Sequence, residues 1–180
     1  MEQTKPNPTN VAIKWTLINI VTGIILTYVF QFANIGVSSS VRYLAYIPFV
    51  AFLFLAQKEF KDQLGGYLTF GEGFGIAWRF GVFSGLLLAV FIYLYYGILS
   101  PEMYSKMLEE QRAAMAAKGL SSEQVDQAMG FMNKMGLIFV VISAAIGSAI
   151  MAMVLGIVGC LIFKKERSPL DTPESTDPAV

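Results

Sequence analysis

The sequence predicts an all-α integral membrane protein: a four-helix bundle with an extracytoplasmic two-helix loop between the third and fourth spans. Hydrophobic residues make up 55% of the 180 positions and charged residues only 14%, an unusual balance for a soluble domain. Four long apolar stretches account for the excess, and most charges lie beside them. The apolar side chains must therefore face hydrocarbon instead of a water-bounded core.

The same composition disfavours several function classes. Thirteen basic residues balance thirteen acidic ones, so no overall field attracts nucleic acid. Histidine, the commonest metal ligand and general base, is absent from the sequence, and a single cysteine, Cys160, allows no internal disulfide. We predict no catalytic residue, no metal site and no cofactor. The expected partners are the lipid bilayer and other membrane helices, from a second copy or another protein.

The first two spans are predicted at about 15–35 and 41–57. The first contains 18 uncharged residues from Trp15 to Phe32, longer than a signal-peptide core and without a clear cleavage site after it, so retention is favoured over cleavage. The second is close to the lower length limit and contains Arg42 and Pro48, so a buried soluble helix is its alternative. Spanning is favoured because bundles in lipid tolerate such a proline.

The third and fourth spans are predicted at about 77–99 and 136–163. Residues 80–99 are uncharged and end in YLYYGIL, whose tyrosines suit a membrane interface. Residues 136–163 give 28 uncharged positions, more than a bilayer requires, so this helix should tilt or project.

Basic residues near the span ends predict the orientation. Seven of them lie on one side and two, Arg42 and Lys134, on the other; the seven are Lys14, Lys58, Lys61, Arg79, Lys164, Lys165 and Arg167. The positive-inside rule then places both termini in the cytoplasm of a bacterial inner-membrane protein. We divide the chain into disordered cytoplasmic tails at 1–10 and 167–180 and a membrane domain at 11–166, because the tails are polar and proline-rich.

The loop at 100–135 predicts two helices. Ser100 and Pro101 suit a helix start, Lys118 and Gly119 suit its end, and Ser121 with Gln124 forms a capping box for a second helix that can continue into the fourth span. The loop holds six of the nine methionines. Thioethers suit Cu(I), but without histidine or a nearby cysteine we favour methionine as a flexible apolar filler.

Residues 65–85 hold seven of the sixteen glycines. They lack the spacing of a phosphate-binding loop, and no lysine follows them. Small residues do recur every four positions, at Ala77, Gly81, Gly85 and Ala89 in the third span and at Ser148, Ala152, Gly156 and Cys160 in the fourth. Such rows let helix backbones approach closely in lipid, within one chain or between chains. Cys160 is read as a packing residue instead of a nucleophile.

Two charges flank the start of the third span. Thr69 and Glu72 match a capping box that starts the helix near Phe70, and Glu72 lies seven positions from Arg79, on nearly the same face. We predict mainly interfacial roles for Glu72 and Arg79, with gating or ligand binding at a cytoplasmic mouth as the alternative. Deep polar residues are few, Asn19 foremost, and no intramembrane acid or base marks a carrier.

These patterns favour a non-catalytic scaffold or accessory subunit acting through helix packing, with a small oligomeric channel or transporter subunit as the alternative. The chain also resembles a bacterial inner-membrane family known as domain of unknown function 4199. The resemblance rests on QKEFKDQLGGYLTFGEGF, SPEMY, GLSSEQVDQAM and the final FKKE, and spans residues 10–166. It implies four transmembrane helices and assigns no activity or catalytic residue. Gly73 departs from it, since alanine is common at that position.

Overall fold

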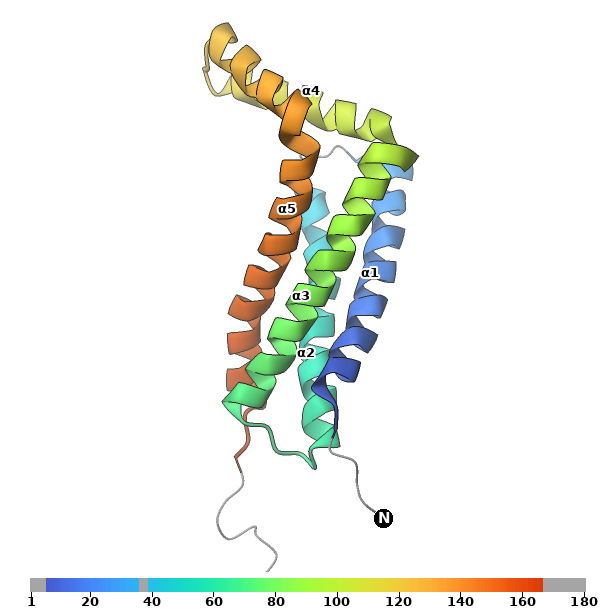
Figure 1. Ribbon diagram of the computed structural model, residues 1–180, viewed down its shortest axis with the longest axis vertical. Helices are drawn as coiled ribbons and strands as arrows, with labels where there is room; N and C mark the ends of the chain where they lie inside the picture. Colours follow the sequence, from blue (N-terminus) through green and yellow to red (C-terminus); the bar gives the residue numbers. More distant parts are fainter. Residues whose placement is uncertain (1–5, 36–38, 167–180) are drawn as a thin grey trace, which may run out of the picture.

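The computed structural model describes residues 6–35 and 39–166, and the regular structure of this part is helical. The elements are α1 (Pro8–Phe32), the 3₁₀ helix η1 (Ser40–Ala45), α2 (Tyr46–Gln63), α3 (Phe70–Leu94), the π-helical turn η2 (Tyr95–Leu99), α4 (Pro101–Ala117) and α5 (Ser122–Phe163). In Figure 1, α1, α2, α3 and α5 run up and down as a bundle, with α4 across one end.

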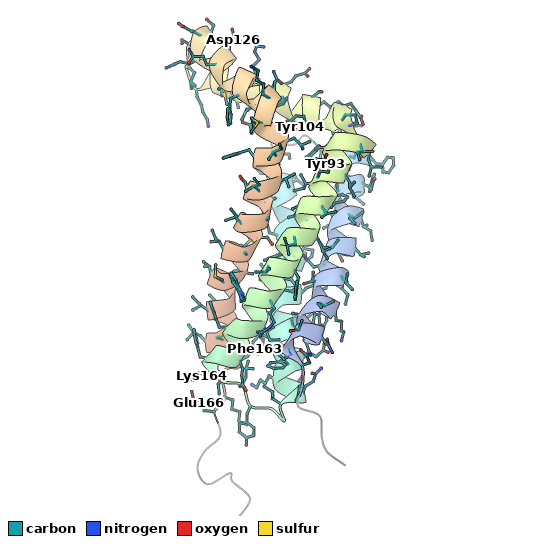
Figure 2. All side chains as sticks on the ribbon, viewed as in Figure 1. Tyr93, Tyr104, Asp126, Phe163, Lys164 and Glu166 are labelled. Atoms are coloured by element: carbon teal, nitrogen blue, oxygen red, sulfur yellow. The ribbon has the colours of Figure 1, made fainter. Side chains whose placement is uncertain are left out.

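Four helical segments of the described chain are long and apolar enough to cross a membrane: Pro8–Phe32, Tyr43–Gln63, Phe70–Leu99 and Ser122–Phe163. This confirms four helices that are long and apolar enough to span a membrane, with α4 and the first part of α5 as a helical segment between the third and the fourth apolar stretch. We call residues 101–135 the hairpin, and we call the opposite end of the bundle, where α1 begins and α5 ends, the termini end. Figure 2 places Lys164 and Glu166 there, far from Tyr104 in the hairpin.

Two helix starts differ from the sequence prediction. α1 begins at Pro8, so residues 8–10 are helical although they were assigned to the tail; the Asn7 side chain caps the helix by accepting from the Thr9 N–H at 2.9 Å. α2 begins at Tyr46, after η1, and not at 41. Pro48 therefore sits in the first turn of α2, where a missing N–H costs nothing. The tail residues 1–5 and 167–180 lie outside the described part.

Both predicted capping boxes are confirmed, Thr69 with Glu72 on α3 and Ser121 with Gln124 on α5. α4 ends at Ala117 with Lys118 as its C-cap, followed by Gly119 with φ of +81°, so Lys118 and Gly119 close the helix as expected. α5 continues from the hairpin into the fourth span without interruption. Ser100 is the N-cap position of α4, but its side chain makes no capping hydrogen bond.

The hairpin has its own small core. Leu108, Val125 and Met129 are buried together, with Met115 and Met132 packed against them. The face of the second hairpin helix that carries Val125 and Met129 is thus covered by α4, and these methionines act as fillers. At the tip, Arg112 forms a salt bridge of 2.5 Å with Asp126.

Tyr104 ties the hairpin to the bend of α5 that is visible in Figures 1 and 2. Its hydroxyl donates to the Met132 carbonyl at 3.0 Å. Burial raises the pKa of the Tyr104 phenol above its ordinary value of 10.0, which further favours the protonated form that donates. Gly136 leaves room for the hydroxyl, because a Cβ there would lie 2.6 Å from it.

The bundle is filled by buried residues of all four spans, in one cluster around Leu53, Phe80 and Ala152 and a second around Phe60, Leu68 and Ile76 nearer the termini end. The outer faces are apolar as well: Ile25 and Val154 are 57% and 59% exposed. A water-soluble protein seldom exposes apolar residues in continuous rows, so these faces fit a hydrocarbon solvent.

Candidate functional site: the seam between α3 and α5

The two small-residue rows face each other. A Cβ added at Gly81 would lie 2.5 Å from the Ala152 Cβ, and one added at Gly85 would lie 2.5 Å from the Ala145 carbonyl oxygen. A Cβ at Gly156 would overlap the Ala77 side chain. The rows therefore form a contact within one chain, in which the backbones of α3 and α5 approach as closely as glycine permits. We call this contact the seam.

The predicted seam residues differ in how deeply they lie. Fully or nearly fully buried are Ala77, Gly81, Gly85, Ala152, Gly156 and Cys160, whereas Ser148 and Ala89 are half-buried. The Ser148 hydroxyl donates to the Gly81 carbonyl at 3.5 Å, a long bond across the seam.

Two seam residues escaped the sequence prediction. Ala145 and Ala149 contact the positions of Gly85 and Gly81, so the line of contact on α5 runs through 145, 149, 152, 156 and 160. One of these steps is three residues and the others are four, because a helix turns every 3.6 residues and a strict spacing of four drifts around the helix. A spacing that allows steps of three as well as four would have found them.

A buried glutamine crosses the seam near the termini end. Gln57 of α2 is fully buried, and its Nε2 donates to the Gly73 carbonyl of α3 at 3.1 Å and to the Gly156 carbonyl of α5 at 3.0 Å. One side chain therefore joins three helices. In a bilayer, an amide that bonds to helix carbonyls stabilises the assembly, because leaving it unpaired in hydrocarbon is costly.

The sequence signal for Gln57 was present but unused. The buried face of α2 runs through Phe49, Leu53, Ala56 and Phe60 at helical spacing, and position 57 lies on that face. Gln57 is also the last residue of the predicted second span. When only the length of a span is considered, a hydrophilic residue there is read as the end of the span and not as a buried residue.

The oxygen of the Gln57 amide explains why residue 159 is a glycine. Within residues 6–35 and 39–166 the Gln57 Oε1 has no hydrogen-bond partner, and it lies where a Cβ of residue 159 would be. Glycine is thus the residue that leaves room for the amide at this point. Cys160, beside it, packs its sulfur against Gly73, whose Cβ would lie 2.8 Å away, and the thiol contacts the Phe70 carbonyl oxygen at 3.6 Å.

Polar contacts also hold α1. The Thr16 hydroxyl donates to the Phe80 carbonyl at 3.4 Å and accepts from Ser84 at 3.5 Å. At the termini end, the Glu59 carboxylate of α2 accepts from Lys14 and from the Trp15 indole, both at 2.7 Å. Trp15 therefore binds α1 to α2.

Glu72 and Arg79 lie apart from the seam. Glu72 accepts from the Thr69 N–H and hydroxyl at 2.9 and 2.8 Å, which is its capping role. Arg79 donates from Nη1 to the Gly75 carbonyl at 2.9 Å. Both side chains line one cleft at the termini end. Gating or ligand binding there stays a prediction. Asn19, half-buried, lines a separate cavity of about 190 Å³ between the helices.

The four apolar helices and their inward-facing seam give the architecture of a multi-pass α-helical membrane protein. Within that class, residues 14–165 match the family described as "Protein of unknown function (DUF4199)", and the chain belongs to that family. No curated protein and no solved structure matches the chain.

We predict that Gly85→Leu disrupts the seam whereas Gly147→Leu, on the outer face of α5, does not. A side chain at Gly85 meets the backbone of α5, and overpacking of this kind costs about 1–3 kcal/mol or more. A Cβ at Gly147 meets nothing within 4 Å. Thermal unfolding of both variants in mild detergent measures the difference. Equal midpoints would contradict a close-packed seam.

We predict that Gly159→Ala is destabilising and that Gln57→Ala rescues it. The alanine methyl collides with the Gln57 amide, so removing the amide should relieve the collision, with a coupling energy of about 1–2 kcal/mol. The measurement is a double-mutant cycle of unfolding free energies from denaturant titration in mixed micelles. Additive effects of the two changes would show that the amide does not lie against Gly159.

Proposed function

We propose that this protein is a non-catalytic scaffold or accessory subunit that holds other membrane helices, in the bacterial inner membrane with both termini in the cytoplasm. The orientation is supported by Lys14, Lys58, Lys61, Lys164 and Lys165, which all belong to the termini end, where the positive-inside rule favours the cytoplasm. The non-catalytic role is supported by the polar side chains of the interior, since Gln57 and Thr16 are engaged in bonds between helices.

The observation that carries the scaffold role is an apolar groove between α2 and α5. It has a volume of about 500 Å³ and is lined by Tyr46, Val50, Gly147, Ile150, Met151, Val154 and Leu155. Gly147 and Ser143, one turn apart on α5, are exposed small residues outside the seam. Because the seam rows are used within the chain, this groove is where the backbone of a neighbouring helix can come close.

The test uses a photo-crosslinking residue at Ile150 in native membranes. We expect a cross-linked protein adduct, from a second copy or another membrane protein, that is reduced at least several-fold by Gly147→Leu, which fills the groove without disturbing the fold. The same crosslinker at Val90, on the outer face of α3 and 57% exposed, is the control and should give no such adduct. Adducts with lipid alone at Ile150 would contradict the scaffold role.

One observation favours a channel or transporter subunit as the second candidate. The cavity of about 190 Å³ is lined by Asn19, Thr27, Ser84 and Ser148 among apolar neighbours, so part of a polar path exists between the helices. Solute flux in liposomes that depends on Asn19 would favour this function over the scaffold.

We predict that a cysteine at Ala114 in the hairpin reacts with a membrane-impermeant maleimide in intact cells, and that one at Asp62 reacts only after permeabilisation. Both positions are exposed, at opposite ends of the bundle. Both cysteines are introduced into a Cys160→Ala protein, which lacks the native thiol. The Cys160→Ala protein alone is the control that should not be labelled. Labelling of Asp62→Cys alone in intact cells would reverse the proposed orientation.

A further inference from the structure

A polar cleft of about 510 Å³ lies at the termini end, between the start of α1, the end of α2 and the start of α3. It is separate from the seam and from the groove between α2 and α5. Phe60 and Leu64 supply apolar wall, Gly71 and Gly75 lie on the α3 side, and Glu72 and Arg79 bring one negative and one positive charge.

Packing does not account for the two glycines of this cleft. Gly73, Gly81 and Gly85 of α3 are each pressed against another side chain or backbone. A Cβ at Gly71 would meet nothing within 4 Å, and one at Gly75 would meet only the Arg79 guanidinium, at 3.0 Å. Two unpacked glycines four positions apart therefore leave a bare stretch of α3 backbone facing this cleft.

The two charges are placed for a ligand that carries both signs. Arg79 folds back along α3 so that Nη1 bonds to the Gly75 carbonyl, which brings the guanidinium toward the turn of Glu72. Glu72 uses Oε2 for Thr69. In the described residues neither group is in a salt bridge, so the remaining guanidinium donors and Oε1 are available.

We propose that the cleft binds the phosphoethanolamine headgroup of a membrane phospholipid, with the phosphate on Arg79 and the ammonium on Glu72. A guanidinium binds phosphate oxygens in bidentate fashion, and a carboxylate accepts from an ammonium group. An anionic phosphoglycerol headgroup offers Glu72 no cation. A choline headgroup offers a cation without N–H groups. Gly71 and Gly75 have no side chain that would exclude the headgroup, and Phe60 and Leu64 can contact its carbon atoms.

The position of the cleft along the membrane normal favours a lipid over a soluble ligand. Trp78, next to Arg79, is 46% exposed, and exposed tryptophans of membrane helices collect at the headgroup level. Arg79 is thus at the depth where lipid phosphates lie. Glycerophosphoethanolamine, a soluble phosphodiester, carries the same charges as the lipid headgroup, so the experiment must separate the two sources.

The test is native mass spectrometry of the full chain in detergent, titrated with phosphatidylethanolamine, phosphatidylglycerol and phosphatidylcholine. We expect the first to bind at least tenfold more tightly than the other two. Arg79→Gln and Glu72→Gln should each remove this preference. Glutamine also completes a capping box, so Glu72→Gln removes the charge while keeping the helix start.

Gly71→Ala separates binding from folding. Alanine fits there without collision and favours the helix, so the unfolding midpoint should not fall, whereas the methyl group in the cleft should weaken phosphatidylethanolamine binding about fivefold. Gly130→Ala is the matched control, because Gly130 is an equally open helical glycine in the hairpin. It should leave lipid binding unchanged.

Three results would overturn the inference. One is equal affinity for the three lipids. Another is a preference that persists in Arg79→Gln and Glu72→Gln variants whose unfolding midpoints match the parent. The third is glycerophosphoethanolamine, which lacks acyl chains, displacing the lipid at equal concentration, since the site would then serve a soluble ligand.

Discussion

The close approach of α3 and α5 is the contact on which the rest of the bundle depends. In hydrocarbon there is little hydrophobic force between helices, so association rests on packing at short range and on hydrogen bonds. Glycine and alanine on both sides of the seam bring the backbones together. Only then do the Gly73 and Gly156 carbonyls lie near enough for the single amide of Gln57 to bond to both. The glutamine is thus placed by the seam and in turn fixes α2.

The same solvent explains where the other polar groups lie. Thr16, Ser84 and Ser148 turn inward and bond across helices, while the ionic contacts of Lys14 and Lys164 are at the termini end, where water and headgroups can solvate them. The hairpin is stabilised differently, because its apolar side chains are buried in a small core of its own around Leu108 and its salt bridge lies at the tip. One chain therefore combines a bundle stabilised by close packing with a hairpin stabilised by burial of apolar side chains.

The sequence predicted what depends on local chemistry. Uncharged runs located the four helices that are long and apolar enough to span a membrane, and two capping boxes located the starts of α3 and α5. What depends on helix phase was harder. Ala145 and Ala149 were missed because a fixed spacing of four does not follow a 3.6-residue turn, and Gln57 was missed because its direction depends on how α2 sits between α3 and α5. Glu72 and Arg79 could be paired from their spacing, but the other walls of the cleft could not be predicted, since they come from α1 and α2 and exist only once α1 packs beside α3.

The glycine-rich start of α3 has two faces, and this resolves why its glycines follow no known motif. Gly73 looks inward, toward Cys160 and Leu68, and continues the close packing of the seam. Gly71 and Gly75 look outward into the cleft, where the other helices leave their Cβ positions open. Residues two apart on a helix point about 200° apart, so alternate glycines serve opposite sides. An alanine at position 73 would bear on packing alone, because the inward face of α3 meets the cysteine sulfur.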